Sequence, residues 1–178
     1  RALDRARKEA NNRLKELESL TRHDSLTGLL NRRGFDLSLA DLLNRTGPNP
    51  SVAVFLLDLD GFKPINDTYS HDAGDMVLKT IGDRLTEMVS GHGCAARFGG
   101  DEFALVLKDR VDQAAALEFG RKLVLSIQQP IHHSGRALQV SASVGVALAA
   151  TGKETVGNLC TAADQAMYRA KGSHGAKV

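Results

Sequence analysis

The chain has 178 residues, 42% of them hydrophobic and 25% charged, which is the composition of an ordinary soluble protein large enough for one domain core. Its formal net charge of +2 and its lack of Trp provide neither the basic surface nor the stacking aromatics of a nucleic-acid-binding protein. No apolar run approaches the roughly 20 residues of a membrane-spanning helix. We therefore expect no nucleic-acid partner and no membrane contact by this chain itself.

The two cysteines, Cys94 and Cys160, each lie in an apolar neighbourhood, which predicts reduced core thiols and a cytoplasmic location. The histidines show no metal-ligand spacing, and we expect the pair His132-His133 in an exposed loop. Because the chain begins at Arg1 rather than at Met, we expect an excised piece of a longer protein, and a membrane-anchored parent is compatible with this expectation.

Residues 1–22 are strongly charged and favour a helix. An apolar residue recurs every seven positions at Leu3, Ala10 and Leu17. This spacing indicates an amphipathic helix or a short coiled coil. A lone surface helix fits equally well, because Arg7 and Thr21 interrupt the apolar stripe.

The next segment combines a helix with a strand that ends in acids. A helix capped at Asp24 or Thr27 is expected to run to about Leu43, followed by a Gly- and Pro-containing loop over 46–50. Residues 51–57 form a nearly unbroken apolar run, which predicts a strand buried on both faces.

The strand ends in Asp58-Leu59-Asp60, and period-two geometry places Asp58 and Asp60 on the same side. Hard cations such as Mg²⁺ prefer carboxylate oxygens and usually share their remaining positions with water and phosphates. An EF-hand calcium loop also begins Asp-x-Asp. Here its fifth, sixth and twelfth positions are Phe62, Lys63 and Tyr69, which excludes that motif.

The rest of the chain alternates between helices and strands. We expect helices at about 63–69, 75–89, 112–128 and 156–171, a hairpin formed by 94–98 and 103–107, and a strand over 137–149. This mixture predicts an α+β fold in which a mainly antiparallel central sheet is flanked by helices, packed mainly on one face.

The hairpin carries the sequence Arg97-Phe-Gly-Gly-Asp-Glu-Phe103. Its two glycines suit a tight turn, and Asp101 and Glu102 follow directly at the tip of the ribbon. Carboxylates in that position can serve a metal ion or a reacting hydroxyl. A Gly-Gly-Asp turn without any function is the alternative.

With the hairpin, six segments resemble a GGDEF domain, the catalytic module of diguanylate cyclases. In the family's order they are DSLTGLLNRR (24–33), DLDGFKPIND (58–67), HDAGD (71–75), RFGGDEF (97–103), SVGV (143–146) and ADQAMYRAK (163–171). The resemblance implies a catalytic domain over 23–178, an α/β sandwich similar to polymerase palm and class III nucleotide cyclase domains. It also implies that residues 1–22 are a signalling helix, which joins an upstream sensory domain.

The resemblance also implies roles for individual residues. Asp58, the backbone carbonyl of Leu59, Asp101 and Glu102 would bind Mg²⁺ or Mn²⁺, and the three acids would be catalytic. The residues implied to bind substrate are Phe62, Lys63, Asn66, His71, Asp75, Leu78 and Lys171. Among them, Asn66 and Asp75 would bind the guanine edge beside Leu78, and the two lysines would bind phosphate. These roles agree with the chemistry, because a carboxylate accepts from the guanine N1–H and amine, and lysine is a good phosphate partner.

The implied activity is condensation of two GTP molecules into cyclic di-GMP with release of two pyrophosphates, at a site between two facing domains of a homodimer. Two departures from the family pattern stand out. Ser90 and Gly93 occupy the Arg-x-x-Asp positions of the inhibitory product site, so that site looks absent. Gly175 replaces a phosphate-binding arginine.

Two other functions remain open. A catalytically inactive GGDEF domain would act as a GTP-binding regulatory module. A cyclase or polymerase-like enzyme would select another nucleotide, but Asp75 counts against adenine, which has no N1–H donor.

Overall fold

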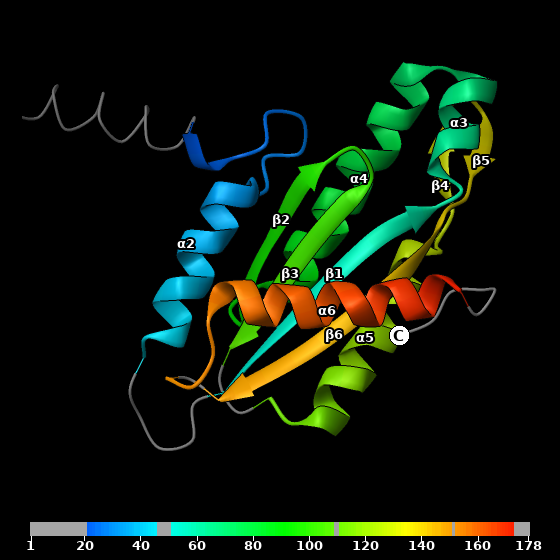
Figure 1. Cartoon of the computed structure of the whole chain (residues 1–178). Coiled ribbons are helices and arrows are strands. Elements are labelled where there is room, and N and C mark those ends of the chain that lie inside the picture. Colours follow the sequence, from blue (N-terminus) through cyan, green and yellow to red (C-terminus); the bar gives the residue numbers. More distant parts are fainter. Residues whose placement is uncertain (1–20, 46–50, 109–110, 151, 173–178) are drawn as a thin grey trace, which may run out of the picture.

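The computed structural model describes residues 21–45, 51–108, 111–150 and 152–172. Within these ranges helices and strands alternate along the chain (Figure 1). The elements are α2 (Arg32–Leu43), β1 (Ser51–Asp60), α3 (Phe62–Tyr69), α4 (His71–Val89), β2 (Gly93–Gly99), β3 (Glu102–Lys108), α5 (Gln113–Ile127), β4 (Ile131–His133), β5 (Arg136–Leu138), β6 (Ser141–Ala150) and α6 (Val156–Lys171).

The central sheet has four strands in the order β2-β3-β1-β6, and every neighbouring pair is antiparallel. β4 and β5 pair with each other as a small separate hairpin. The apolar run 52–57 places β1 inside the sheet, where it pairs with β3 on one side and with β6 on the other. As a result, Asp58 lies directly across from Glu102 of β3 and from Ser143 of β6.

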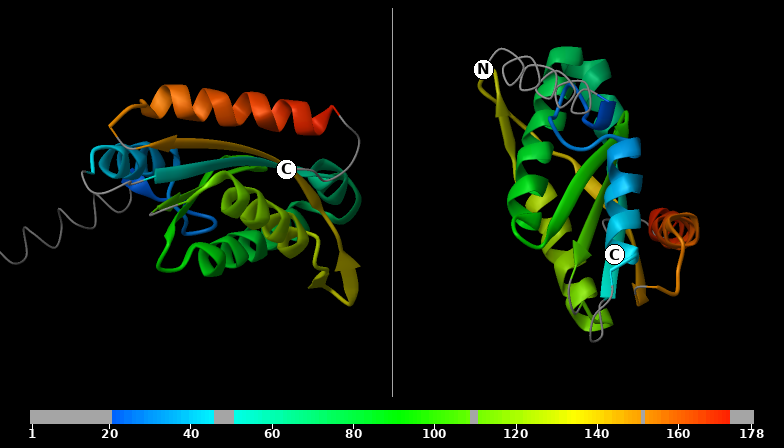
Figure 2. Two further views of the ribbon diagram at one scale, coloured as in Figure 1. Left: turned by 90° about the horizontal axis from the view of Figure 1, so that it is seen from below. Right: turned by 90° about the vertical axis from the view of Figure 1, so that its left-hand side faces the viewer.

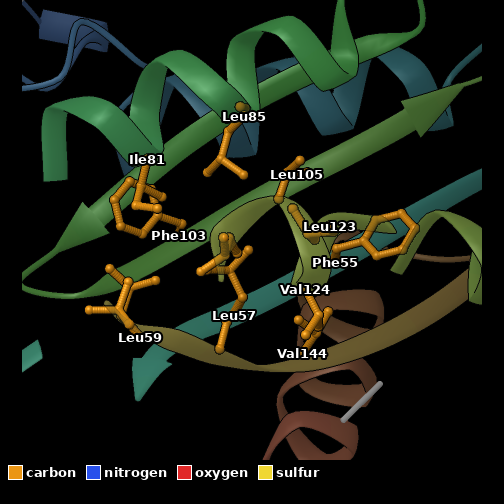
Figure 3. Close-up of a cluster of buried hydrophobic side chains, with 14 of the residues drawn as sticks. Phe55, Leu57, Leu59, Ile81, Leu85, Phe103, Leu105, Leu123, Val124 and Val144 are labelled. Atoms are coloured by element: carbon orange, nitrogen blue, oxygen red, sulfur yellow. The ribbon is translucent and has the colours of Figure 1, made fainter. Parts of the chain in front are cut away.

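One face of the sheet is covered by α4 and α5. Alternate residues of β1, including Phe55 and Leu57, point into a core formed with Ile81 and Leu85 of α4 and Leu123 of α5 (Figure 3). These side chains are almost fully buried.

The opposite face is covered by α2 and α6. A second core joins Val54 and Leu56 of β1 to Phe35 of α2 and Leu159 of α6. Figure 2 shows α6 on one side of the sheet and α4 with α5 on the other. The predicted α+β fold with an antiparallel sheet is confirmed, but the expectation that helices pack mainly on one face is wrong. A strand buried on both faces requires cover on both.

A glycine fixes the distance between α6 and the sheet. A Cβ at Gly145 of β6 would overlap the carbonyl oxygen of Ala163 and the amide nitrogen of Met167. Only glycine lets the helix lie this close to the strand, and this contact sets where Lys171, at the end of α6, lies relative to the sheet edge.

Three expected boundaries differ from the structure. The first helix begins at Arg32, where the side chain of its N-cap Asn31 accepts from the Gly34 amide, whereas residues 25–27 form a turn. The second helix of the pair α3–α4 begins at His71 rather than Asp75. The strand expected over 137–149 is divided at residues 139–140 into β5 and β6, and the histidine pair belongs to β4 rather than to a loop.

The helix predicted over 1–22 lies almost wholly outside the described residues, as does Gly175. Among the helices of the described ranges, none has the length and apolarity to cross a membrane.

Candidate active site

The end of β1 presents two acids on the face of the sheet that α6 covers. Leu57 and Leu59 point into the core under α4 and α5, so Asp58 and Asp60 point the other way, as their spacing predicts. Asp60 accepts a hydrogen bond from the Ser143 hydroxyl, with 2.9 Å between Oγ and Oδ2. Asp58 instead forms an ion pair with Lys171 of α6, so the two acids have different partners.

The turn between β2 and β3 brings a second pair of acids to the same edge. Gly99 and Gly100 have φ angles of 138° and 51°, in the region that favours glycine. Immediately after them, the carbonyl of Asp101 accepts from the Leu59 amide at 3.1 Å, which fixes the turn to the end of β1. Glu102 lies directly opposite Asp58 in the strand register.

Lys171 supplies the positive charge at this edge. Its Nζ lies 2.9 Å from Asp58 Oδ1, and the two side chains are 41% and 16% exposed. The hydrogen bond to Asp58 raises the pKa of Lys171. Burial, followed by the negative charge of Asp58, raises the pKa of the Asp101 carboxyl even though Lys171 acts in the opposite direction. An acid with a raised pKa is a stronger base once ionised, which suits proton transfer.

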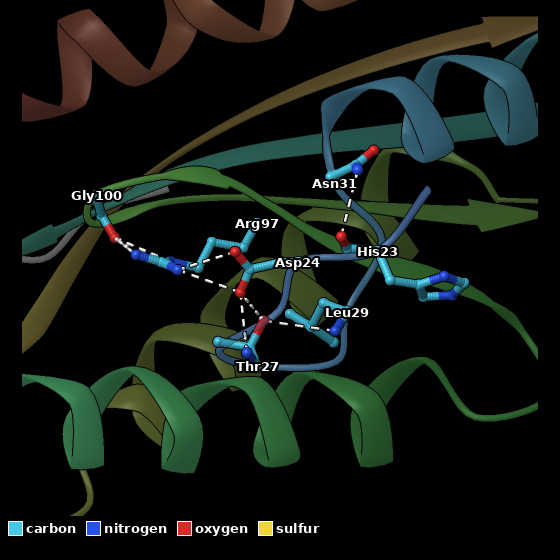
Figure 4. Close-up of polar contacts among 7 residues, drawn as sticks. All are labelled: His23, Asp24, Thr27, Leu29, Asn31, Arg97 and Gly100. Atoms are coloured by element: carbon cyan, nitrogen blue, oxygen red, sulfur yellow. Dashed lines mark hydrogen bonds and ion pairs between the residues drawn. The ribbon is translucent and has the colours of Figure 1, made fainter. Parts of the chain in front are cut away.

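The turn between β2 and β3 is anchored by a contact between residues far apart in the sequence. Arg97 donates to the Gly100 carbonyl at 3.0 and 2.8 Å, and its Nη1 donates to both carboxylate oxygens of Asp24 at 3.2 and 3.0 Å (Figure 4). The Thr27 amide and hydroxyl also donate to Asp24 Oδ1, at 2.9 and 2.7 Å. Burial by itself raises the pKa of Asp24, but the hydrogen bonds from Thr27 and the charge of Arg97 outweigh it and leave the pKa below its ordinary value of 3.8.

Sequence reasoning included Asp24, Thr27 and Arg97 in the motifs but gave them no role in the site. The position of Arg97, two residues before the first glycine of the turn, was the feature of the sequence that could have indicated a role in holding the turn. Nothing local indicated that its partner is 73 positions away.

The residues predicted to contact the base lie on α3 and α4. A Cβ at Gly74 would overlap Asn66 Oδ1, so the Asn66 side chain packs against α4 one residue before Asp75. Asp75 is exposed and Leu78 is buried. The Asn66 amide of α3 thus lies beside the turn of α4 that carries Asp75, and Leu78 follows one turn later on α4.

The other predicted substrate residues lie around the start of the same two helices. Lys63 is exposed in the first turn of α3, and His71 is exposed in the first turn of α4. Phe62 is buried at only 8% exposure. Its ring therefore contributes to the core, and its backbone amide belongs to the helix start, where anions are favoured.

The donors at the edge suit a hard divalent cation. Within the described residues there is no group of three or more His, Cys, Asp or Glu side chains arranged as a metal cluster. Asp58, Asp101 and the Leu59 carbonyl, the predicted ligands, would supply part of the oxygen shell of Mg²⁺, whose coordination is commonly completed by phosphates and water. Like charges directly opposite on paired strands, as with Asp58 and Glu102, are unfavourable without a cation.

A cavity of about 620 Å³ lies beside this edge, between α2, α6 and β3. Its lining includes Glu102 with Asp164 and Met167 of α6 and Arg32 of α2. Glu102 is the only predicted site residue in its lining. The predicted site is thus an open edge of the sheet with this cavity next to it.

A model of the family described as "Diguanylate cyclase, GGDEF domain" matches residues 21–177. The chain belongs to the GGDEF domain family. The resemblance found in the sequence is thereby confirmed.

Known GGDEF proteins resemble the chain in sequence and in structure. It is 39% identical to the bifunctional diguanylate cyclase/cyclic di-GMP phosphodiesterase MucR of Pseudomonas aeruginosa over 158 residues. The aligned region covers 88% of this chain and 23% of MucR. The crystal structure of a sensory box/GGDEF family protein from Caulobacter crescentus matches with a TM-score of 0.79 at 40% identity, covering 85% of this chain and 99% of that one. The coiled coil and GGDEF domain of DgcB from Caulobacter crescentus, solved in complex with c-di-GMP, matches with a TM-score of 0.83 at 25% identity, covering 99% and 96%. The chain spans between 20% and 23% of the length of MucR and two further curated relatives.

The two positions at which the sequence lacks the Arg and Asp of the inhibitory product site lie where α4 ends and β2 begins. Ser90 follows the last residue of α4, and Gly93 begins β2. A Cβ at Gly93 would overlap the carbonyl oxygen of Val106 on the paired strand. An aspartate could not occupy this position without displacing β3.

Proposed function

We propose that this domain is a diguanylate cyclase, which condenses two GTP molecules into cyclic di-GMP and releases two pyrophosphates. The observation that carries the proposal is the gathering of Asp58, Asp101 and Lys171 at one sheet edge, with Lys171 Nζ 2.9 Å from Asp58 Oδ1. Carboxylates beside a lysine are the combination expected for a site that binds a metal ion together with a triphosphate. Membership of the GGDEF domain family supports cyclic di-GMP synthesis as the reaction at this site.

In each of two equivalent steps, the 3′-oxygen of one GTP forms a bond to the α-phosphorus of the other. The bond from that phosphorus to the oxygen bridging to the β-phosphate breaks, and pyrophosphate leaves. The hydroxyl proton goes to Asp101, whose carboxylate is the proposed base. Lys171 and Lys63 bind the phosphates as point charges.

Asp58, the Leu59 carbonyl and Asp101 would bind Mg²⁺ or Mn²⁺, with Glu102 beside them. A metal ion in that position supplies charge neutralisation at the phosphates and a lower pKa of the attacking hydroxyl.

Guanine selection is assigned to Asn66 and Asp75, with the buried Leu78 near the base. The Asp75 carboxylate would accept from the guanine N1–H and amine, which adenine cannot supply together. We therefore predict that Asp75→Ser narrows the preference for GTP over ATP by about tenfold or more, since an unpaired donor or acceptor costs about 1–3 kcal/mol. Competition binding with both nucleotides measures the ratio, and an unchanged ratio would remove Asp75 from this role.

One domain carries one set of guanine-binding residues, so we propose that two domains face each other as a homodimer, each presenting its GTP to the other. Residues 1–22 would join an upstream sensory domain, which would control that encounter. The free thiols Cys94 and Cys160 agree with a reducing compartment, and we place the domain in the cytoplasm.

The proposal is tested by incubating the purified 178-residue chain with GTP and Mg²⁺ and identifying the separated nucleotides. Asp101→Asn is the matched control, because it keeps the size of the side chain and removes its charge. We expect cyclic di-GMP from the native chain and at least a hundredfold less from the variant. GTP binding without product, at high protein concentration, would instead indicate a regulatory GTP-binding module.

A further inference from the structure

Lys171 is paired with Asp58, the carboxylate proposed above to bind the metal ion. Its ammonium lies 2.9 Å from Asp58 Oδ1, and Asp58 is only 16% exposed. The side chain comes from the last residue of α6, a helix that Gly145 allows to pack directly on β6. Lys171 is therefore delivered to the carboxylate by a closely packed helix.

The ammonium compensates a concentration of negative charge. Asp58 faces Glu102 across the strands, and Asp101 lies close enough for its carboxyl to respond to the charge of Asp58. Among the described residues, no other lysine or arginine forms an ion pair with any of these three acids. Lys171 is the local cation of the cluster.

A divalent ion bound by Asp58 Oδ1 would sit about 2.1 Å from that oxygen, and so within about 5 Å of the ammonium if the lysine stayed in place. Like charges at such a separation in a partly buried site repel each other strongly. The lysine side chain is flexible and 41% exposed, so it can move away. The bound triphosphate offers it a new partner of opposite charge.

We propose that Lys171 is an exchangeable cation: it competes with the metal ion for Asp58, and metal entry transfers its ammonium to the phosphates of the nucleotide. The second half of this inference rests on the proposed function, since it takes GTP as the nucleotide. The consequence is a coupling in which the metal ion and the triphosphate each favour the binding of the other. Lys63, the other predicted phosphate-binding lysine, is exposed and has no ion pair among the described residues, so it gives a matched contrast.

The test is a titration of the 178-residue chain with Mn²⁺ in the absence of nucleotide, followed by the electron paramagnetic resonance signal of free Mn²⁺. Removing a half-exposed competitor in Lys171→Met should tighten Mn²⁺ binding about two- to fivefold, the range expected for a partly screened ion pair. Lys171→Arg keeps the competing charge and should stay near the native affinity. Lys63→Met should leave Mn²⁺ affinity within about twofold.

The same variants are then titrated with a fluorescent GTP analogue at saturating Mn²⁺. Lys171→Met and Lys63→Met should both weaken nucleotide binding, whereas only Lys171→Met strengthens metal binding. These opposite signs at one residue distinguish exchange from a structural role, which would weaken both. Unchanged or weaker Mn²⁺ binding in Lys171→Met would overturn the proposal.

A measurement on the native chain does not depend on how the variants fold. The side-chain ε-CH₂ resonance of Lys171, assigned by its loss in Lys171→Arg, should shift on addition of Mg²⁺ alone and saturate with metal binding. No shift at saturating Mg²⁺ would overturn the exchange. Because none of these readouts requires turnover, the inference can stand even if the chain makes no cyclic di-GMP, and it can fail in an active cyclase.

Discussion

The contact between Arg97 and Asp24 gives the sharpest prediction about what keeps the β2–β3 turn in place. Arg97→Met removes the guanidinium but keeps much of the apolar stem. It deletes two hydrogen bonds to the Gly100 carbonyl and the ion pair with Asp24. The Asp24 carboxylate keeps its hydrogen bonds from Thr27 and loses the positive charge of Arg97.

The magnitude follows from how little of this pair meets water. Its side chains are 12% and 18% exposed. Removing one partner of a fully buried pair costs about 3–5 kcal/mol, and partial access of water to Asp24 lowers this to about 2–3 kcal/mol for Arg97→Met. Because Gly100 loses its anchor immediately before Asp101, we also expect product formation to fall more than GTP binding.

Urea denaturation followed by circular dichroism at pH 7 measures the free energy of unfolding. The control is Lys122→Met, which breaks a pair with Glu118 whose side chains are 67% and 55% exposed, and which should change stability by about 0.5 kcal/mol or less. If Arg97→Met costs no more than this control, the contact does not anchor the turn and the reasoning fails.

Three further predictions rest on separate contacts. Gly145→Ala should destabilise the fold by about 1–3 kcal/mol, because its Cβ would overlap α6. The control is Gly157→Ala on α6, whose Cβ would meet nothing within 4 Å and which should be neutral or slightly stabilising. Thermal unfolding compares the two variants, and equal effects would refute the close approach of α6 to β6. Gly74→Ala should weaken GTP binding about five- to tenfold by displacing Asn66, with the fold retained; calorimetry showing native affinity would count against this placement. Because its pKa is lowered on folding, the ionised Asp24 stabilises the fold above pH 3.8, and this contribution is lost as the pH falls through the lowered pKa. The free energy of unfolding of the native chain should therefore fall more steeply below pH 4 than that of Asp24→Asn. Parallel plots of unfolding free energy against pH would contradict this.

Much of the fold followed from local patterns in the sequence. The apolar run before Asp58, the glycine pair before Asp101 and the span of α6 up to Lys171 were all predicted as observed. These features are set by burial and by backbone conformation within a few residues, which periodicity and glycine positions report well.

The parts that were missed depend on contacts between distant segments. The anchoring of the turn joins Arg97 to Asp24, and no local pattern specifies that pairing. Asn31 caps α2 rather than Asp24 or Thr27, and Asp24 contacts Thr27 and Arg97. The cover on both faces of the sheet was implied by the doubly buried β1, but the number of helices on each face depends on chain path rather than on composition.

The central claim, that two facing domains condense GTP, is tested most directly by the specific activity of the chain as a function of its concentration. With GTP and Mg²⁺ saturating, cyclic di-GMP formed per molecule of protein should rise with protein concentration and level off once dimers dominate. A constant specific activity in a protein shown to be monomeric by light scattering would contradict the facing-site account, and absence of product throughout the range would contradict the cyclase assignment.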